Sequence, residues 1–498
     1  MKRIIKLCAV IIILLIILSA FLIGLIIKYG YGVSQQGNIY VVKNTEYTGL
    51  SEQERFITDF DFLYNELKEN YVLFDYKEQV LGLDLEKEYQ SYRKKIEMVN
   101  DERKFYALCS EFVRLFDDDH MDFACYSRET RQKIRSVINS DYTVLFDYRV
   151  IEGKPIIISA HRDFDAPGWE IISINDIPFR EIEAVMKKTL HKQRIKGGEI
   201  LQYFSLYKET IPEKLEILLK NRNNEEKYIE IDFSRRYEPL LERGTPDINF
   251  GHYQNDQLPQ ARTIDEKIGY ILIPSFSPPP RVMRETFKKI VEDFENIGIK
   301  GLIIDIRYNG GGNESFRDIL GYLTSEEIVI CNFRYKKTER FQDIFYLRHL
   351  YESLRFKTSR KAEKGYTDWW AWTIKPADNQ FLTTIPVVLL ANDYTFSSAD
   401  SFVGACLEYD LAHVLANSVR LSGGGLPVRV FLPSRNYYVS YGVWEGWSSD
   451  LSHLIEGRKL EPDIRVEQTL EDYFQGIDTY LKTALDYLDK IILETEGI

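Results

Sequence analysis

Two stretches of the chain carry residues that could do chemistry. In the first, residues 301–316 (GLIIDIRYNGGGNESF), an apolar run leads into Gly310, Gly311 and Gly312, and a helical pattern follows. Glycines allow positive φ angles and let backbone N–H groups approach a ligand closely. A strand, a glycine turn and a helix N-terminus together can stabilise negative charge on a reacting atom. Taken alone, three glycines are more often an ordinary tight turn.

The second stretch, residues 392–402 (NDYTFSSADSF), offers three serines as possible nucleophiles, Ser397, Ser398 and Ser401. It directly follows an apolar run typical of a buried strand, and a helical pattern lies behind it. A serine at such a turn exposes its hydroxyl in the positive field of the helix N-terminus. The spacing of Ser397 and Asp400 is also that of a helix capping box. Both roles for Ser397 stay open, and they are compatible.

A serine nucleophile needs a base, and the base needs a group that orients it. Of the seven histidines, His120 stands out because it follows a helical region within an acidic loop, DDDHMDF. Those acids could also suggest a metal site. However, only one histidine is nearby and no second cluster has the spacing of a zinc site, so we expect no metal.

Length and composition set the frame for these residues. A chain of 498 residues should hold two to three domains, and 44% hydrophobic with 28% charged residues is ordinary for a globular protein. The net charge of −12 is spread along the chain, which argues against a nucleic-acid partner. Five scattered cysteines without paired spacing indicate neither a disulfide framework nor a zinc site.

The N-terminus contains an apolar run at residues 7–27 that is long enough to cross a bilayer as a helix. Three basic residues precede it, which places the short N-terminus in the cytoplasm and the rest of the chain outside. A cleaved signal peptide is the alternative, but its apolar core is usually shorter and no small-x-small site follows. We expect a single-pass anchor at residues 7–28 in the cell membrane, with the catalytic part extracytoplasmic.

Several elements must position the two reactive stretches. Apolar residues at three-to-four spacing predict helices between residues 51 and 115, and short alternating runs predict strands from about 142 to 233. Beyond residue 267, strands alternate with helical patterns, which predicts an α/β layer fold with a largely parallel sheet. Residues 469–493 predict one long amphipathic helix.

The chain resembles a known family through three motifs, GLIIDIRYNGGG, TFSSADSF and EGRKLEPDIRVEQTLEDYFQGIDTYLKTALDYL. Together, and in this order, they resemble the C-terminal-processing (tail-specific) serine proteases, a family that includes the tricorn core protease and the interphotoreceptor retinoid-binding protein. The resemblance covers residues 267–488, and extends more weakly to the helical region through its Asp-His motif. It implies a βαβ-rich, crotonase-like catalytic core.

The resemblance also implies roles for single residues. It makes Ser397 the nucleophile, with an oxyanion hole built from the backbone N–H of Ser398 and of Gly310 or Gly311. The bacterial tail-specific branch takes its base from a lysine about 25 residues after the serine, but the matching stretch here, RLSGGG at 420–425, has none.

Tricorn-like members use a serine, a histidine and a glutamate instead, and the matching residues here are His120 and Glu456. The resemblance therefore implies a Ser397–His120–Glu456 triad. His120 would take the serine proton, and Glu456 would orient the imidazole. Because His120 precedes Ser397 by a long stretch and belongs to another predicted domain, we expect the triad to form across an interface, with a hinge motion that gates activity.

The expected fold is an α/β, crotonase-like core with an N-terminal helical domain, a β-rich middle domain that loosely resembles PDZ modules, and one transmembrane helix. The expected function is that of a membrane-anchored serine endopeptidase that acts on peptides or proteins without a cofactor. A non-catalytic homologue that binds a ligand or peptide on the same scaffold is the alternative. The expected segments are a cytoplasmic N-terminus (1–6), anchor (7–28), tether (29–50), helical domain (51–135), middle domain (136–235), linker (236–266) and protease core (267–498).

Overall fold

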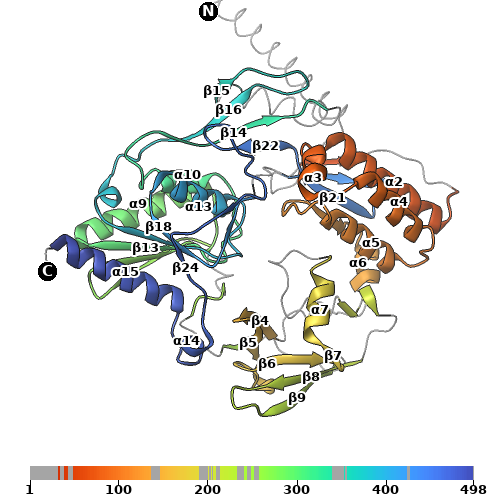
Figure 1. The fold of residues 1–498 in the computed structure, drawn as a ribbon, viewed down its shortest axis with the longest axis horizontal. Helices are drawn as coiled ribbons and strands as arrows, with labels where there is room; N and C mark the ends of the chain where they lie inside the picture. The colour runs from red at the N-terminus through yellow and green to blue at the C-terminus, as the bar shows by residue number, and fades with distance from the viewer. Residues whose placement is uncertain are drawn as a thin grey trace, which may run out of the picture.

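A six-stranded sheet forms the centre of the C-terminal part of this computed structural model (Figure 1). The structure describes residues 32–33, 39–42, 49–135, 146–189, 200, 203–204, 206–208, 213–232, 241–243, 248–251, 257–338, 353, 356–422 and 427–496. The strands of the sheet lie in the order β11 (Gln260–Ile264), β12 (Ile268–Leu272), β13 (Gly301–Asp305), β17 (Val387–Leu390), β18 (His413–Ala416) and β24 (Ile464–Arg465). β11 is antiparallel to β12, and the other pairs are parallel. The largely parallel sheet predicted from the sequence is therefore confirmed.

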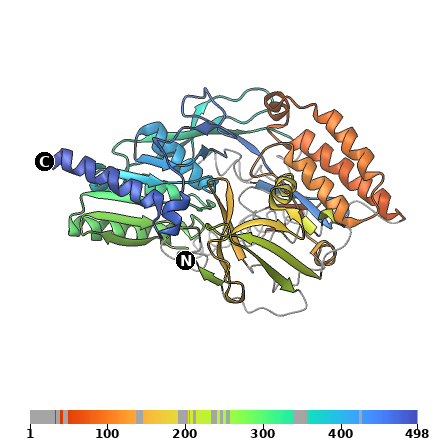
Figure 2. The same ribbon diagram turned by 60° about the horizontal axis from the view of Figure 1, so that its bottom comes forward.

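Helices cover both faces of this sheet, as parallel strands require. Leu302 and Ile304 of β13 pack under one helical layer, and Ile303 between them packs under the other. The first layer consists of α9 (Pro280–Ile297), α10 (Ser315–Leu320) and α13 (Ser398–Tyr409). The second is α15 (Thr479–Glu496), which lies along the opposite face (Figures 1 and 2).

The C-terminal helix is not continuous, so the prediction of one long helix over 469–493 is wrong. α14 (Leu470–Phe474) ends just before Gly476, and α15 begins at Thr479. Gly476 has φ +72°, a left-handed conformation in which glycine is favoured and which terminates helices. The break places Asp478 directly before α15, where its carboxylate contacts Arg307 at the end of β13.

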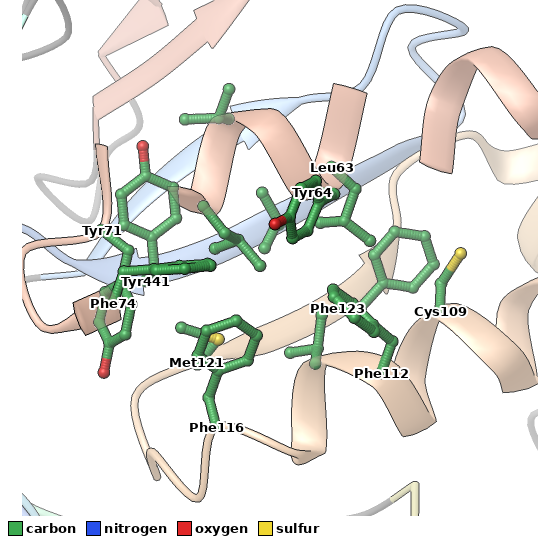
Figure 3. Packing of buried hydrophobic residues seen from close by; sticks show 14 of the residues in the cluster. Leu63, Tyr64, Tyr71, Phe74, Cys109, Phe112, Phe116, Met121, Phe123 and Tyr441 are labelled. Carbon is green, nitrogen blue, oxygen red and sulfur yellow. The ribbon is translucent and has the colours of Figure 1, made fainter. Parts of the chain in front are cut away.

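The N-terminal helices share a hydrophobic core with strands from the C-terminal part of the chain (Figure 3). The helices are α2 (Glu52–Asn70), α3 (Phe74–Leu81), α4 (Leu85–Ile96), α5 (Glu102–Arg114) and α6 (Arg128–Arg135). Between α5 and α6, β3 (Asp122–Cys125) pairs with β21 (Tyr437–Gly442), which pairs with β20 (Pro427–Phe431). Tyr71 and Phe116 of the helical part lie close to Tyr441 of β21 in this core.

This shared core bears on the expected hinge. The helical segment and the protease core are continuous in their packing, since one set of buried side chains comes from both. Opening a hinge between them would expose that apolar surface to water, at a cost of roughly 25 cal/mol for each Å². The expectation of a hinged helical cap is therefore not supported by the packing.

The middle segment is rich in antiparallel strands, as expected, and it includes the helix α7 (Phe179–Met186). Its sheet has the order β10-β5-β6-β8-β9, with β4 also on β5 and β7 also on β6. The strands are β4 (Phe146–Ile151), β5 (Lys154–His161), β6 (Glu170–Ile174), β7 (Ile177–Pro178), β8 (Lys214–Lys220), β9 (Glu226–Asp232) and β10 (Leu241–Arg243).

Two connecting segments contain strands that the sequence interpretation did not include. Within the expected linker 236–266, β10 joins the middle sheet and β11 joins the core sheet. Within the expected tether 29–50, β1 (Gly32–Val33) pairs with β2 (Ile39–Val42), and β2 pairs with β20. The run Ile-Tyr-Val-Val of β2 has high β-propensity, which is the local signal for this pairing.

A smaller antiparallel sheet packs beside α13. Its order is β15-β16-β14-β22, from β15 (Lys357–Arg360), β16 (Trp369–Ile374), β14 (Ile328–Tyr335) and β22 (Trp444–Trp447). β19 (Val419–Arg420) and β23 (Lys459–Leu460) form a separate pair.

The expected membrane anchor at residues 7–28 lies outside the described residues. Within the part of the chain that the structure describes, no helix combines the length and the apolar character needed to cross a bilayer.

Candidate active site

The glycine turn is held in place by a buried charge network at the end of β13. Arg307 Nη2 lies 2.7 Å from Asp305 Oδ2 and 2.8 Å from Asp478 Oδ2, and all three side chains are buried. Tyr270 Oη and Asn249 Nδ2 also donate to Asp305, at 2.8 and 3.0 Å. Asp305 and Arg307 thus form a buried ion pair beside the glycine turn, and Asp478, directly before α15, is its third member.

The glycine turn and the serine loop are joined by direct backbone contacts. Asn309 accepts a hydrogen bond from the backbone N–H of Phe396 at 3.0 Å, and its own side chain donates to Ile273 at 2.9 Å. Gly311 has φ +85°, and a Cβ at this position would lie 2.6 Å from the Phe396 carbonyl oxygen and 2.7 Å from Ser397 Cβ. Only a glycine allows the two loops to approach this closely.

Ser397 sits at a strained turn immediately before α13. Its φ and ψ are 59° and −123°, outside the regions that non-glycine residues normally occupy. Such a conformation is typical of a serine placed at a sharp strand-to-helix turn with its hydroxyl exposed. Its side chain makes no capping hydrogen bond to α13, so the capping interpretation of the hydroxyl is wrong.

A buried pair of side chains supports this turn from behind. The Ser397 N–H donates to Ser422 Oγ at 3.1 Å, and the Ser422 hydroxyl donates to Asp400 Oδ2. Asp400 is 2% exposed, and burial raises its pKa to about 7. Ser422 lies in the RLSGGG stretch, which contains no lysine.

His120 approaches Ser397 from the loop that follows α5. Its Nε2 lies 3.1 Å from Ser397 Oγ, and its ring packs on Phe396 with 4.7 Å between ring centroids. The backbone N–H of His120 donates to Asp118 Oδ1 at 2.8 Å, and Tyr71 Oη donates to Asp118 Oδ2 at 2.6 Å. Asp118 is fully buried, so these two bonds fix the loop that carries the histidine.

Glu456 lies next to His120, as the sequence interpretation expects. A ring nitrogen of His120 and one carboxylate oxygen each from Glu456 and Asp118 all lie within 4.8 Å of one another. Glu456 Oε1 also lies 3.2 Å from Lys77 Nζ. Burial, and then the neighbouring Asp118 carboxylate, raise the pKa of Glu456 well above its ordinary value, whereas Lys77 acts in the opposite direction.

The three expected oxyanion-hole residues lie beside Ser397 but differ in their backbone N–H groups. Gly310 and Ser398 line the same cavity as Ser397 and His120. The N–H of Gly311, in contrast, donates to Asn309 Oδ1 at 2.9 Å. The structure therefore distinguishes the two glycines that the sequence left as alternatives.

Three residues that contact Ser397, His120 or Glu456 were not predicted from the sequence. Asp118 was part of the acidic run before His120, but nothing in the sequence separates it from its neighbours. Ser422 lies in the RLSGGG stretch, which the sequence interpretation uses only to show that the expected lysine is missing. Lys77 is a single lysine in α3, and a lysine in an amphipathic helix is normally a solvent-exposed residue, so no local signal could have identified it.

A cavity of about 1230 Å³ extends from Ser397 and His120. Its lining combines apolar side chains from α10, β14, β16, β22 and the loops around them with polar side chains from α13 and from the segment after the glycine turn. The apolar residues include Phe316, Ile330, Cys331, Trp372, Leu421, Trp444 and Ile455. A concave cavity with apolar surface and convergent polar groups is typical of a substrate site.

Comparisons with known proteins agree with this geometry. Residues 267–466 match the model of peptidase family S41. The crystal structure of mature CPAF superposes with a TM-score of 0.63 at 18% identity, covering 88% of this chain and 96% of that chain. The structure of mature CPAF complexed with lactacystin gives a TM-score of 0.61 at 18% identity and covers 88% and 98%. A search of curated protein sequences found no match. Residues 267–466 are thus similar to peptidase family S41, and this match supports a serine-type peptidase.

Proposed function

We propose that this protein is an endopeptidase that cleaves peptide bonds through a Ser397–His120–Glu456 triad. The observation that carries the proposal is the 3.1 Å contact between His120 Nε2 and Ser397 Oγ, made by residues 277 positions apart. The family match supports a serine-type peptidase, and it covers Ser397 and Glu456 but not His120. The contact between His120 and Ser397 places the histidine, which lies outside the matched residues, beside the serine.

The chemistry follows from the geometry. The Ser397 hydroxyl attacks the carbonyl carbon of the scissile bond while His120 Nε2 takes its proton, and the carbonyl electron pair moves onto oxygen. When the tetrahedral intermediate collapses, the C–N bond breaks and His120 returns the proton to the leaving amine. Water then attacks the acyl-enzyme in the same way. Glu456 stabilises the imidazolium in both halves of the reaction.

We propose that the N–H groups of Gly310 and Ser398 form the oxyanion hole. Ser398 begins α13, so its N–H belongs to the positive end of a helix. Of the two glycines, Gly311 already donates its N–H to Asn309 Oδ1, so we assign the second donor to Gly310. Gly311 would then shape the hole without donating to it.

A glycine exchange tests this division of roles. In Gly311→Ala, the new Cβ would meet backbone atoms of Phe396 and Ser398 and displace the nucleophile loop. We expect kcat/KM to fall by about 10²–10³, the loss typical of a misplaced oxyanion donor. Gly310→Ala is the matched control, because its Cβ meets no atom within 4 Å. Its loss should be far smaller, and equal losses in a peptide-cleavage assay would contradict the assignment.

The cavity suggests the class of substrate. Its apolar residues, including Trp372 and Trp444, line the same cavity as Ser397. We propose that they receive an apolar side chain of the substrate close to the scissile bond, since such a side chain gains free energy when it leaves water. The anchor expected at residues 7–28 would place this reaction outside the cytoplasm, at the surface of a cell membrane.

Labelling with a fluorophosphonate probe tests the proposal directly. The probe should attach to the wild-type protein, and mass spectrometry should find the adduct on Ser397 rather than on Ser398 or Ser401. The labelled protein should no longer cleave peptides. Absence of both labelling and cleavage, together with tight binding of a peptide, would identify a binding homologue on the same scaffold instead.

A further inference from the structure

Lys77 is a buried lysine that the proposed triad does not explain. It lies in α3, and its side chain is only 5% exposed. Lysines are almost never buried unless a partner compensates the charge. Its Nζ lies 3.2 Å from Glu456 Oε1, and it also donates to the backbone carbonyl of Asp117 at 2.9 Å.

These two contacts connect the two loops that carry the partners of Ser397. Asp117 lies three residues before His120, and Glu456 lies 379 positions after Lys77. A single ammonium group therefore touches the backbone of the histidine loop and the side chain of the glutamate. Since α3 belongs to the core shared with β20 and β21, its position is fixed by packing (Figure 3).

Lys77 is also the cation that Glu456 contacts among the residues the structure describes. Arg420 is the other cation nearby, but it pairs with Asp117 at 2.8 Å and with Asp119 at 3.9 Å. The charged and titratable groups that face Glu456 are Lys77, Asp118, Asp119, His120, Arg420 and Tyr71. Two of them are carboxylates that favour a neutral Glu456, and a neutral acid cannot stabilise an imidazolium.

We propose that Lys77 is a positioning residue of the triad, which favours the ionised form of Glu456 and fixes its carboxylate beside the His120 loop. The proposal rests on the proposed triad function. It gives the helical region a part in the reaction beyond carrying His120. Removing the ammonium makes protonation of the His120–Glu456 pair easier, whichever member binds the proton, because a nearby positive charge disfavours both protonated forms.

The test is the pH dependence of kcat/KM in Lys77→Met, which keeps most of the length of the side chain and removes its charge. Activity requires the deprotonated pair, so it is present above the apparent pKa of the pair and is lost as the pH falls through it. We expect this acid limb to move up by about one to three pH units, the effect of an opposite charge at this distance. At about one pH unit or more below the midpoint of the wild-type limb, activity should fall at least about tenfold, and it should largely recover at high pH.

Further variants separate this role from a structural one. Lys77→Arg keeps the charge and should keep most of the wild-type profile. In a Glu456→Gln background, Lys77→Met should shift the limb far less, because its target is gone. Lys68→Met, which removes an exposed ion pair between Lys68 of α2 and Glu86 of α4, is the matched control and should leave the profile unchanged. If Lys77→Met does not fold, Lys77→Gln, whose amide can still donate to Glu456, provides the same measurement.

Two results would overturn the proposal. One is an acid limb that stays in place in the neutral variants, and the other is a loss of kcat/KM that is equal at every pH. Neither result would question the triad, which fluorophosphonate labelling and Glu456→Gln test in the wild-type background. A wild-type protein without labelling or cleavage would instead remove the proposed function itself.

Discussion

Ser397→Ala should abolish peptide cleavage and fluorophosphonate labelling, with a fall in kcat of about 10⁶. The variant loses the only atom that can form the covalent intermediate, while the cavity and the glycine turn stay in place. It should also fold at least as well as the wild type. Ser397 has φ +59° and its hydroxyl makes no capping bond, so the exchange removes no hydrogen bond that stabilises α13.

The controls for this variant come from the same helix. Ser401→Ala lies one turn further along α13 and should still be labelled, which shows that the probe distinguishes the candidate serines. Circular dichroism and thermal unfolding should agree between Ser397→Ala and the wild type. Cleavage by Ser397→Ala at a rate within tenfold of the wild type would show that another residue attacks the substrate.

The glycine turn and the serine loop could be predicted because each is marked by a local sequence pattern. The glycine turn and the serine loop each follow a buried parallel strand, and strands of that kind are readable as short apolar runs. β13 and β17 are parallel neighbours and end at the same edge of the sheet, so the two loops meet there. The contact between Asn309 and Phe396 is the outcome of that arrangement.

The supporting half could not be predicted, because its signals lie in the packing of distant segments. Lys77 reaches Glu456 only because α3 packs in one core with β20 and β21, and no pattern around Lys77 records this. The same argument applies to Tyr71 and Asp118, because their hydrogen bond depends on tertiary structure. Residue patterns alone single out His120 among the histidines, because of its acidic loop. The roles of His120 and Glu456 in a triad come from the resemblance to a family.

The shared core also changes how the site is expected to work. Sequence separation suggested that the histidine and the serine belong to separate bodies that close on substrate. Instead, His120 Nε2 and Ser397 Oγ lie at hydrogen-bond distance, and backbone N–H groups in both loops donate to buried side chains. A site assembled in this way needs little reorganisation in the transition state, which is the condition under which fixed dipoles are most effective.

His120→Ala should reduce kcat about as strongly as Ser397→Ala, by about 10⁶, because an unactivated serine is a poor nucleophile at neutral pH. The variant separates the proposed triad from a serine–lysine mechanism, in which a lysine from elsewhere would take the serine proton and activity would survive. The matched control is His413→Ala on β18, whose ring stacks on Tyr487 at 4.1 Å between ring centroids. Loss of cleavage and of rapid fluorophosphonate labelling in His120→Ala alone would assign the base. Activity that persists in His120→Ala would mean that its contact with Ser397 is structural, and Lys77, the buried lysine next to Glu456, would then be the first residue to test as the base.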